Sequence, residues 1–157
     1  MSTELKYTVR GDPRTKKNSQ VIAGSGARCP RCGKFAKQWI RQGTNYDNYA
    51  EQAAWQLRPK PAEPISKAVN VRYLFFMQTR RRVDLTNLME AMDDILVARG
   101  ILADDNSNVI AAHDGSRVLY DKALPRVEIT ITEIRSDVGI GPYENGEHCS
   151  PLQEDDA

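Results

Sequence analysis

The stretch from Arg80 to Asp105 combines residue types that could cut a phosphodiester backbone. It opens with three adjacent arginines, Asp84 follows closely, further acidic residues continue along the chain, and the pair Asp104-Asp105 ends it. Guanidinium groups bind phosphate, and carboxylates bind divalent cations. Cation and anion sites therefore lie side by side in the sequence, which points to cleavage of a nucleic acid.

One amphipathic helix must position these groups. Apolar residues recur with a 3.6-residue period at Leu88, Ala91, Met92, Ile95 and Leu96, and Asn87, Glu90 and Asp94 fall on the other side. Asp84 or Thr86 can cap the start, and Arg99-Gly100 supplies a cation and a glycine at the end. The pattern predicts a helix from about Thr86 to Arg99.

The chain that follows this helix decides whether its flanking carboxylates can meet. The helix would be about 21 Å long, and an extended return from Gly100 to Asp105 would cover about 17 Å. Asp84 and the pair Asp104-Asp105 are therefore expected to converge at the N-terminal end of the helix, where a cation must balance them. Oxygen ligands favour Mg²⁺ or Mn²⁺. The alternative is structural: Asp84 is only a helix cap and Asp104-Asp105-Asn106 only a turn.

The order of an arginine run, Asp-Leu-x-Asn-Leu, an amphipathic helix, glycine and Asp-Asp resembles the RusA family of Holliday junction resolvases. These endonucleases nick four-way DNA junctions as homodimers and use Mg²⁺. The resemblance runs from the N-terminal strand to about Ile134, and Lys16-Lys17-Asn18-Ser19 is similar to a motif of phage-type relatives. It implies that Asp84 and Asp105 are metal-binding catalytic carboxylates, with Asp104 close by.

Two positions depart from the family pattern. Thr86 replaces the second aspartate of Asp-Leu-Asp-Asn-Leu, and Glu90 replaces a lysine four residues later. Residues i and i+4 share a helix face, so Glu90 can restore the missing carboxylate. The expected catalytic and metal-binding residues are Asp84, Glu90, Asp104 and Asp105. The expected DNA-binding residues are Lys16, Lys17, Asn18, Arg80, Arg81 and Arg82.

Charge is distributed unevenly along the 157 residues. Residues 1–82 hold 17 Lys and Arg against 5 Asp and Glu, whereas residues 83–157 hold 5 against 16. This asymmetry predicts a basic surface that faces nucleic acid and an acidic segment elsewhere. Membrane-spanning runs and a signal-peptide core are missing from the sequence, so a cytoplasmic protein without membrane contact is expected.

A Gly-, Lys- and Arg-rich insertion at residues 23–45 contains Cys29-Pro30-Arg31-Cys32-Gly33-Lys34. Two thiolates at this spacing form half of a tetrahedral zinc site. Three alternatives stay open: His148 and Cys149 complete the site, two protomers share one ion, or the pair remains free thiols in a reducing cytosol.

The remaining patterns predict an α+β domain over residues 1–135, with a mixed or antiparallel sheet and two helices packed on one face. The expected elements are a strand at 5–9, a helix at about 46–58 ended by Pro59, an apolar strand at 68–77, a hairpin pairing 109–112 with 117–120, and a strand at 127–132. His113 is assigned to the hairpin turn rather than to catalysis, and Trp55 to the core or a dimer contact.

The free face of the sheet suits a homodimer, because a four-way junction has pseudo-two-fold symmetry. Residues 136–157 are expected to form a disordered acidic tail. The main functional prediction is a Mg²⁺-dependent endonuclease that resolves Holliday junctions. The rival is a non-catalytic nucleic-acid-binding protein, with or without zinc, and a third alternative is a resolvase relative that has lost its chemistry.

Overall fold

The computed structural model describes residues 4–16 and 20–134. The elements of this part, in chain order, are β1 (Glu4–Arg10), β2 (Gln20–Ala23), β3 (Trp39–Gln42), α1 (Thr44–Gln56), β4 (Val69–Met77), α2 (Leu85–Ala98), β5 (Ile110–Ala112), β6 (Arg117–Tyr120) and β7 (Arg126–Glu133). The predicted disordered tail lies outside the described residues. Neither α1 nor α2 has the length and apolarity that a membrane crossing requires.

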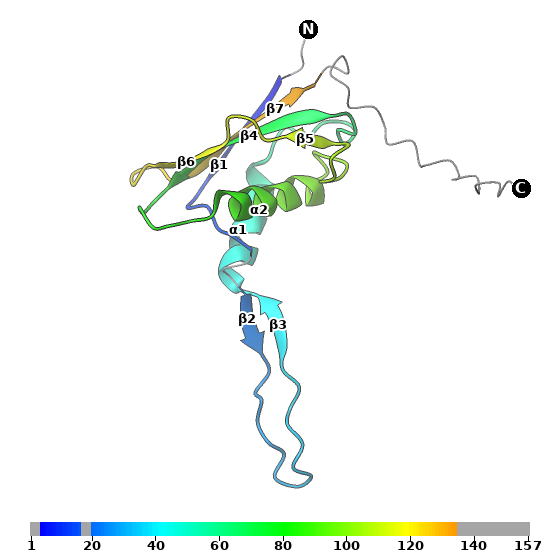
Figure 1. The fold of residues 1–157 in the computed structure, drawn as a ribbon, viewed down its shortest axis with the longest axis vertical. Helices are drawn as coiled ribbons and strands as arrows, with labels where there is room; N and C mark the ends of the chain where they lie inside the picture. The colour runs from blue at the N-terminus through cyan, green and yellow to red at the C-terminus, as the bar shows by residue number, and fades with distance from the viewer. Residues whose placement is uncertain (1–3, 17–19, 135–157) are drawn as a thin grey trace, which may run out of the picture.

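A mixed five-stranded sheet is centred on β4 (Figure 1). β7 pairs antiparallel with β1 on one side and with β4 on the other. β5 and β6 both pair parallel with β4 on its second side. Alternate residues of β4 are buried, from Val69 to Met77, because a strand presents every second side chain to the same face. The predicted apolar strand at 68–77 is confirmed.

The two helices lie on the same side of the sheet (Figure 1). The predicted apolar stripe of α2 is buried in full, and α1 contributes Tyr46, Tyr49 and Ala53 to the core. The predicted α+β architecture with two helices is thus confirmed. Trp55 is 65% exposed, so it does not belong to the core, and a dimer contact remains as its predicted role.

The predicted hairpin between residues 109 and 120 is wrong. β5 pairs with the start of β4 and β6 with its end, so the two are successive pieces of one sheet edge. Between them, His113 Nδ1 lies 2.9 Å from the Val71 carbonyl oxygen and the Tyr73 amide donates to Ser116 Oγ at 3.0 Å. Along this stretch of β4, the side chains of His113 and Ser116 therefore take the place of backbone hydrogen bonds. The Asp-Gly turn lies between these two residues and does not reverse the chain into a hairpin.

Strands β2 and β3 form a separate antiparallel ribbon that carries the chain away from the sheet and helices (Figure 1). We call residues 20–42 the arm. It holds five Lys and Arg and lacks Asp and Glu. Its large apolar side chains face solvent, with Phe35 74% and Ile40 69% exposed. The arm corresponds to most of the insertion predicted at residues 23–45.

Candidate active site

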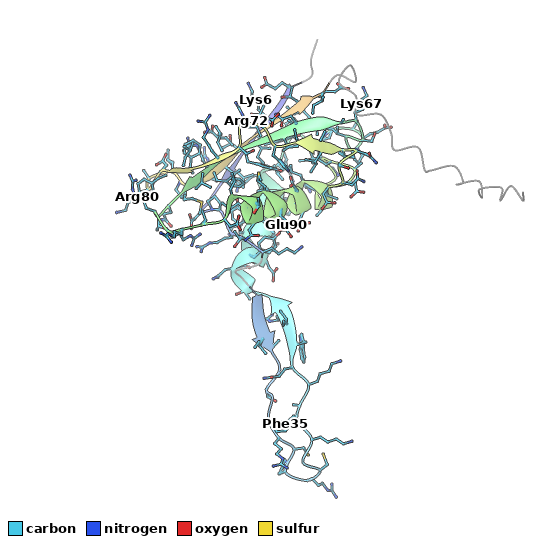
Figure 2. The ribbon with its side chains drawn as sticks, in the orientation of Figure 1. Lys6, Phe35, Lys67, Arg72, Arg80 and Glu90 are labelled. Atoms are coloured by element: carbon cyan, nitrogen blue, oxygen red, sulfur yellow. The ribbon has the colours of Figure 1, made fainter. Side chains whose placement is uncertain are left out.

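The loop at residues 78–83, which we call the arginine loop, joins the end of β4 to Asp84 at the start of α2. Asp12 holds it in place, because one carboxylate oxygen accepts from the Gln78 amide at 2.9 Å and the other lies 3.3 Å from Arg81 Nη2. Arg81 also donates to the Pro13 carbonyl at 3.2 Å. The guanidinium of Arg80 lies over the Tyr120 ring, 4.4 Å from its centre. Figure 2 shows Arg80 at this end of the sheet.

These contacts give Arg80 and Arg81 different roles. All three are exposed. Arg81 is bound to the loop after β1, so it stabilises the arginine loop, whereas Arg80 lies on an aromatic face that leaves its guanidinium edge accessible. The contacts of Arg80 and Arg81 therefore hold the arginine loop next to the start of α2, and phosphate binding stays a prediction.

Asp84 is the N-cap of α2. Its Oδ1 accepts hydrogen bonds from the Thr86 amide at 3.0 Å and from Thr86 Oγ1 at 2.6 Å. Both donors orient the carboxylate, and the positive end of the helix dipole favours its charge. Thr86 thus acts as a donor to Asp84 at the position where the family pattern has a second aspartate. The carboxylate of Asp84 is exposed beside the arginine loop.

Glu90 and Asp94 lie one turn apart on the flank of α2 that faces α1. Lys16 Nζ is 2.7 Å from Asp94 Oδ2, and a groove between the helices is lined by Lys16, Tyr46, Asp94 and Arg99 among others. Burial and the charges of Asp94, Asp47 and Glu90 raise the pKa of Tyr46 to about 12. Lys16 therefore forms an ion pair with Asp94 at this groove. Lys17 and Asn18 lie outside the described residues.

Asp104 and Asp105 form a hydrogen-bonded pair of carboxyl groups after α2. Asp104 Oδ1 accepts from the Asp105 amide at 2.8 Å and its Oδ2 accepts from Asn106 Nδ2 at 2.6 Å. The amide of Asp105 lowers the pKa of Asp104. A hydrogen bond with Asp104, and to a smaller degree burial and the charge of Asp94, raise the pKa of Asp105. Excess negative charge is concentrated here, and a cation would relieve it.

The two carboxylate groups do not meet within one chain. Asp84 precedes α2 and the Asp104-Asp105 pair follows it, and a helix of 14 residues is about 21 Å long. Gly100, at φ +71°, turns the chain, and Ile101 and Leu102 then enter the core instead of running back along the helix. Among the described residues, no three His, Cys, Asp or Glu side chains gather closely enough to hold a metal. The predicted convergence is wrong for a single chain.

A buried charged network in the middle of α2 escaped the sequence analysis. Asp93 is 8% exposed. Its Oδ1 accepts from the Tyr73 hydroxyl at 2.5 Å and its Oδ2 lies 3.2 Å from His113 Nε2. The other ring nitrogen of His113 faces the Val71 carbonyl. Both partners of the imidazole are acceptors, so the doubly protonated ring satisfies them best.

The pKa of His113 reflects this network. Burial lowers it, but the hydrogen bond and the charge of Asp93, together with the Val71 carbonyl, outweigh burial and raise it overall. His113 therefore ties the interrupted sheet edge to α2, as a structural residue. The helical spacing of the apolar stripe does not include Asp93, so the local sequence carried no signal for its burial.

The comparison with known families agrees with the motif around Asp84. The family of the endodeoxyribonuclease RusA matches residues 24–132, well over half of the chain. A search of curated proteins finds no match. The fold and the match define a nuclease domain, and the chain belongs to the RusA endodeoxyribonuclease family, which consists of Holliday junction resolvases. Nucleases of this family generally use Mg²⁺.

Proposed function

We propose that this protein is a homodimeric, Mg²⁺-dependent endonuclease that resolves Holliday junctions by paired, symmetric nicks. The observation that carries the proposal is the arrangement at the start of α2, where an oriented carboxylate, Asp84, follows directly after the anchored arginine loop. In this arrangement, guanidinium groups that can bind phosphate and a carboxylate that can bind a metal lie at one end of the sheet, which supports the proposal. The basic arm adds contacts to the DNA backbone that do not depend on base sequence.

The carboxylates fit Mg²⁺ by their chemistry but not by their number within one chain. Oxygen donors suit this ion, yet Asp84 and the Asp104-Asp105 pair lie at opposite ends of α2. In our proposal a two-fold axis brings the Asp84 end of one copy to the Asp104-Asp105 end of the other. Mg²⁺ bound there would activate a water and polarise the scissile phosphate.

The residues of the chain itself then have separate tasks. Thr86 orients the carboxylate of Asp84, and Asp104 holds Asp105 through their shared hydrogen bond. Glu90, an exposed residue on the flank of α2 that faces α1, supplies a further carboxylate (Figure 2). Arg80 and Arg82 bind phosphate and offset the charge that develops as the phosphodiester is attacked.

The direct test is cleavage of a synthetic four-way junction and of a linear duplex, with Mg²⁺ or EDTA. Asp84→Asn should abolish the Mg²⁺-dependent paired nicks but retain junction binding. Asp114→Asn is the matched control, because the hydrogen bonds of this exposed aspartate to Asn70 use its backbone. Junction binding without cutting by the wild type, under any divalent ion, would refute the nuclease proposal.

Mixed dimers test whether the metal site is shared. If each site joins Asp84 of one copy to the partner's Asp105, a dimer of one Asp84→Asn chain and one Asp105→Asn chain has one intact site and one doubly altered site. Such a dimer should nick one strand, although each variant alone is inactive. If both residues serve a site within their own chain, the mixed dimer has no intact site and stays inactive.

The second candidate function is a non-catalytic junction-binding protein on the same fold. The observations that favour it are the missing three-ligand group within the described part of one chain and the presence of Thr86 and Glu90 at the two altered motif positions. The binding outcome of the cleavage assay would establish this function. Glu90→Lys, which restores the family residue, would then be the variant to test for recovered activity.

A further inference from the structure

The outer end of the arm folds as a tight turn around Cys29 and Cys32. The Cys29 amide donates to the Lys34 carbonyl at 2.8 Å, and the Gly33 amide donates to the Cys29 carbonyl at 2.9 Å. Gly33 adopts φ +71°, a conformation that glycine tolerates best. The backbone amides of Arg31 and Cys32 hydrogen-bond the Cys29 thiol, and so does the Cys32 thiol. Backbone donors thus surround one sulfur, and the second sulfur lies beside it.

This arrangement suits metal binding better than packing. Free cysteines that serve a core are among the most buried residues, whereas Cys29 is only partly buried and Cys32 is exposed. Zn²⁺ takes thiolate ligands in a tetrahedron, with Zn–S distances of about 2.3 Å. The turn is therefore half of a zinc site, formed in advance.

The remaining two ligands must come from elsewhere. In the described part of the chain the other candidate ligand is His113, which is bound to Asp93 and Val71 inside the domain. His148 and Cys149 lie outside the described residues. Thirteen residues, 135–147, lie between Ile134 and His148, and such a segment spans at most about 50 Å when fully extended.

The reach of that segment argues against its use. Cys29 and Cys32 lie about ten residues from the base of the arm, which corresponds to about 33 Å of extended chain. β7 ends at the top of the domain in Figure 1, whereas the arm extends downward from below the helices. Residues 135–147 would have to be almost fully extended across the whole domain, at a large cost in conformational entropy. A second copy of the turn meets no such limit.

We propose that Cys29 and Cys32 of two chains together bind one Zn²⁺ in a four-thiolate site that joins the outer ends of two arms. The charge of the arm makes this contact depend on the metal. Two arms that each carry five Lys and Arg and lack acidic residues repel one another. Four thiolates around Zn²⁺ carry a net charge of −2, which Arg28, Arg31 and Lys34 of each chain can balance. Each thiol that binds releases its proton to solvent.

The test uses the full-length chain with Zn²⁺ as the probe. After equilibration and removal of excess metal, the protein should retain one Zn²⁺ per two chains, and X-ray absorption should show four sulfur ligands. Cys29→Ser and Cys32→Ser should each lose the bound zinc. Both side chains lie outside the core, so circular dichroism should show these variants folded. Cys149→Ser and His148→Ala are the matched controls and should retain zinc at the wild-type ratio.

Two results would overturn the proposal. One Zn²⁺ per chain, lost in Cys149→Ser or His148→Ala, would assign the remaining ligands to the C-terminal segment. Retention of less than one zinc per ten chains would show that the cysteines bind no metal. The site does not rest on the proposed nuclease function, because metal content and coordination are measured without DNA.

Discussion

The two ends of α2 hold their carboxylates in opposite ways. Asp84 accepts hydrogen bonds from Thr86 at the positive end of the helix, and both the hydrogen bonds and the helix dipole favour its charge. Asp104 and Asp105 lie beyond the other end and share a hydrogen bond, so one carboxyl raises the pKa of its neighbour. A cation would stabilise the charge of this pair. This difference is expected if each end supplies half of a site.

The largest effect should be seen when either end is neutralised. Asp84→Asn and Asp105→Asn should each reduce junction cleavage by at least about 100-fold, the order found when one group that stabilises a transition-state charge is removed. Single-turnover cleavage at saturating enzyme measures this loss. A strong effect at one end alone would show that the two ends do not belong to one site.

Asp93, in the middle of α2, serves as a reference because both of its carboxylate oxygens have partners within the chain. Asp93→Asn should destabilise the fold by about 2 kcal/mol or more, because Tyr73 and His113 lose a buried charged partner. Asp94→Asn is the adjacent control and should cost at most about 1 kcal/mol, since it removes an accessible ion pair with Lys16. Urea unfolding compares the two variants. Equal losses would contradict the structural assignment of Asp93.

The stability of two Asp84 variants distinguishes the role of this residue in helix capping from its proposed role in metal binding. Asn caps a helix as well as Asp does, so Asp84→Asn should lower the free energy of unfolding by less than Asp84→Ala, which should lower it by about 1 kcal/mol. Thermal or urea unfolding of the two variants tests this. An Asn variant that is destabilised as much as the Ala variant would mean that the charge of Asp84, rather than its hydrogen bonds to Thr86, stabilises the helix.

The smallest effect concerns pH. His113 has a raised pKa in the folded protein, so the stability that its protonation provides is complete below the pKa of the unfolded chain and is lost as pH rises through the folded value. Stability should therefore decline from mildly acidic to neutral pH. His113→Gln should flatten this dependence. A slope that is unchanged in the variant would assign the pH effect to other groups.

The sequence predicted elements whose periodicity is strong and failed where side chains replace backbone pairing. α2 and β4 follow from regular apolar spacing, and Asp84 follows from its place before the first helical turn. The false hairpin came from an Asp-Gly turn signal, because nothing in the local sequence reveals that His113 and Ser116 bond to β4. Such contacts join residues more than 40 positions apart.

The candidate site shows a similar division. The identities of its carboxylates and arginines could be read from motif order. Their spacing could not, because it depends on Gly100 sending Ile101 and Leu102 into the core, where Leu102 forms a bridge with Ile65. Asp93 was missed because it lies one position from the apolar stripe, and only the tertiary fold brings Tyr73 and His113 to it.

The interruption between β5 and β6 also affects whether another chain can pair with this edge of the sheet. A long, regular edge strand is a template on which another chain can add a strand. Here the edge beside β4 consists of pieces of three and four residues, and between them the polar groups of Val71 and Tyr73 are already satisfied by side chains. An incoming strand therefore finds no continuous ladder to extend on this side of the sheet.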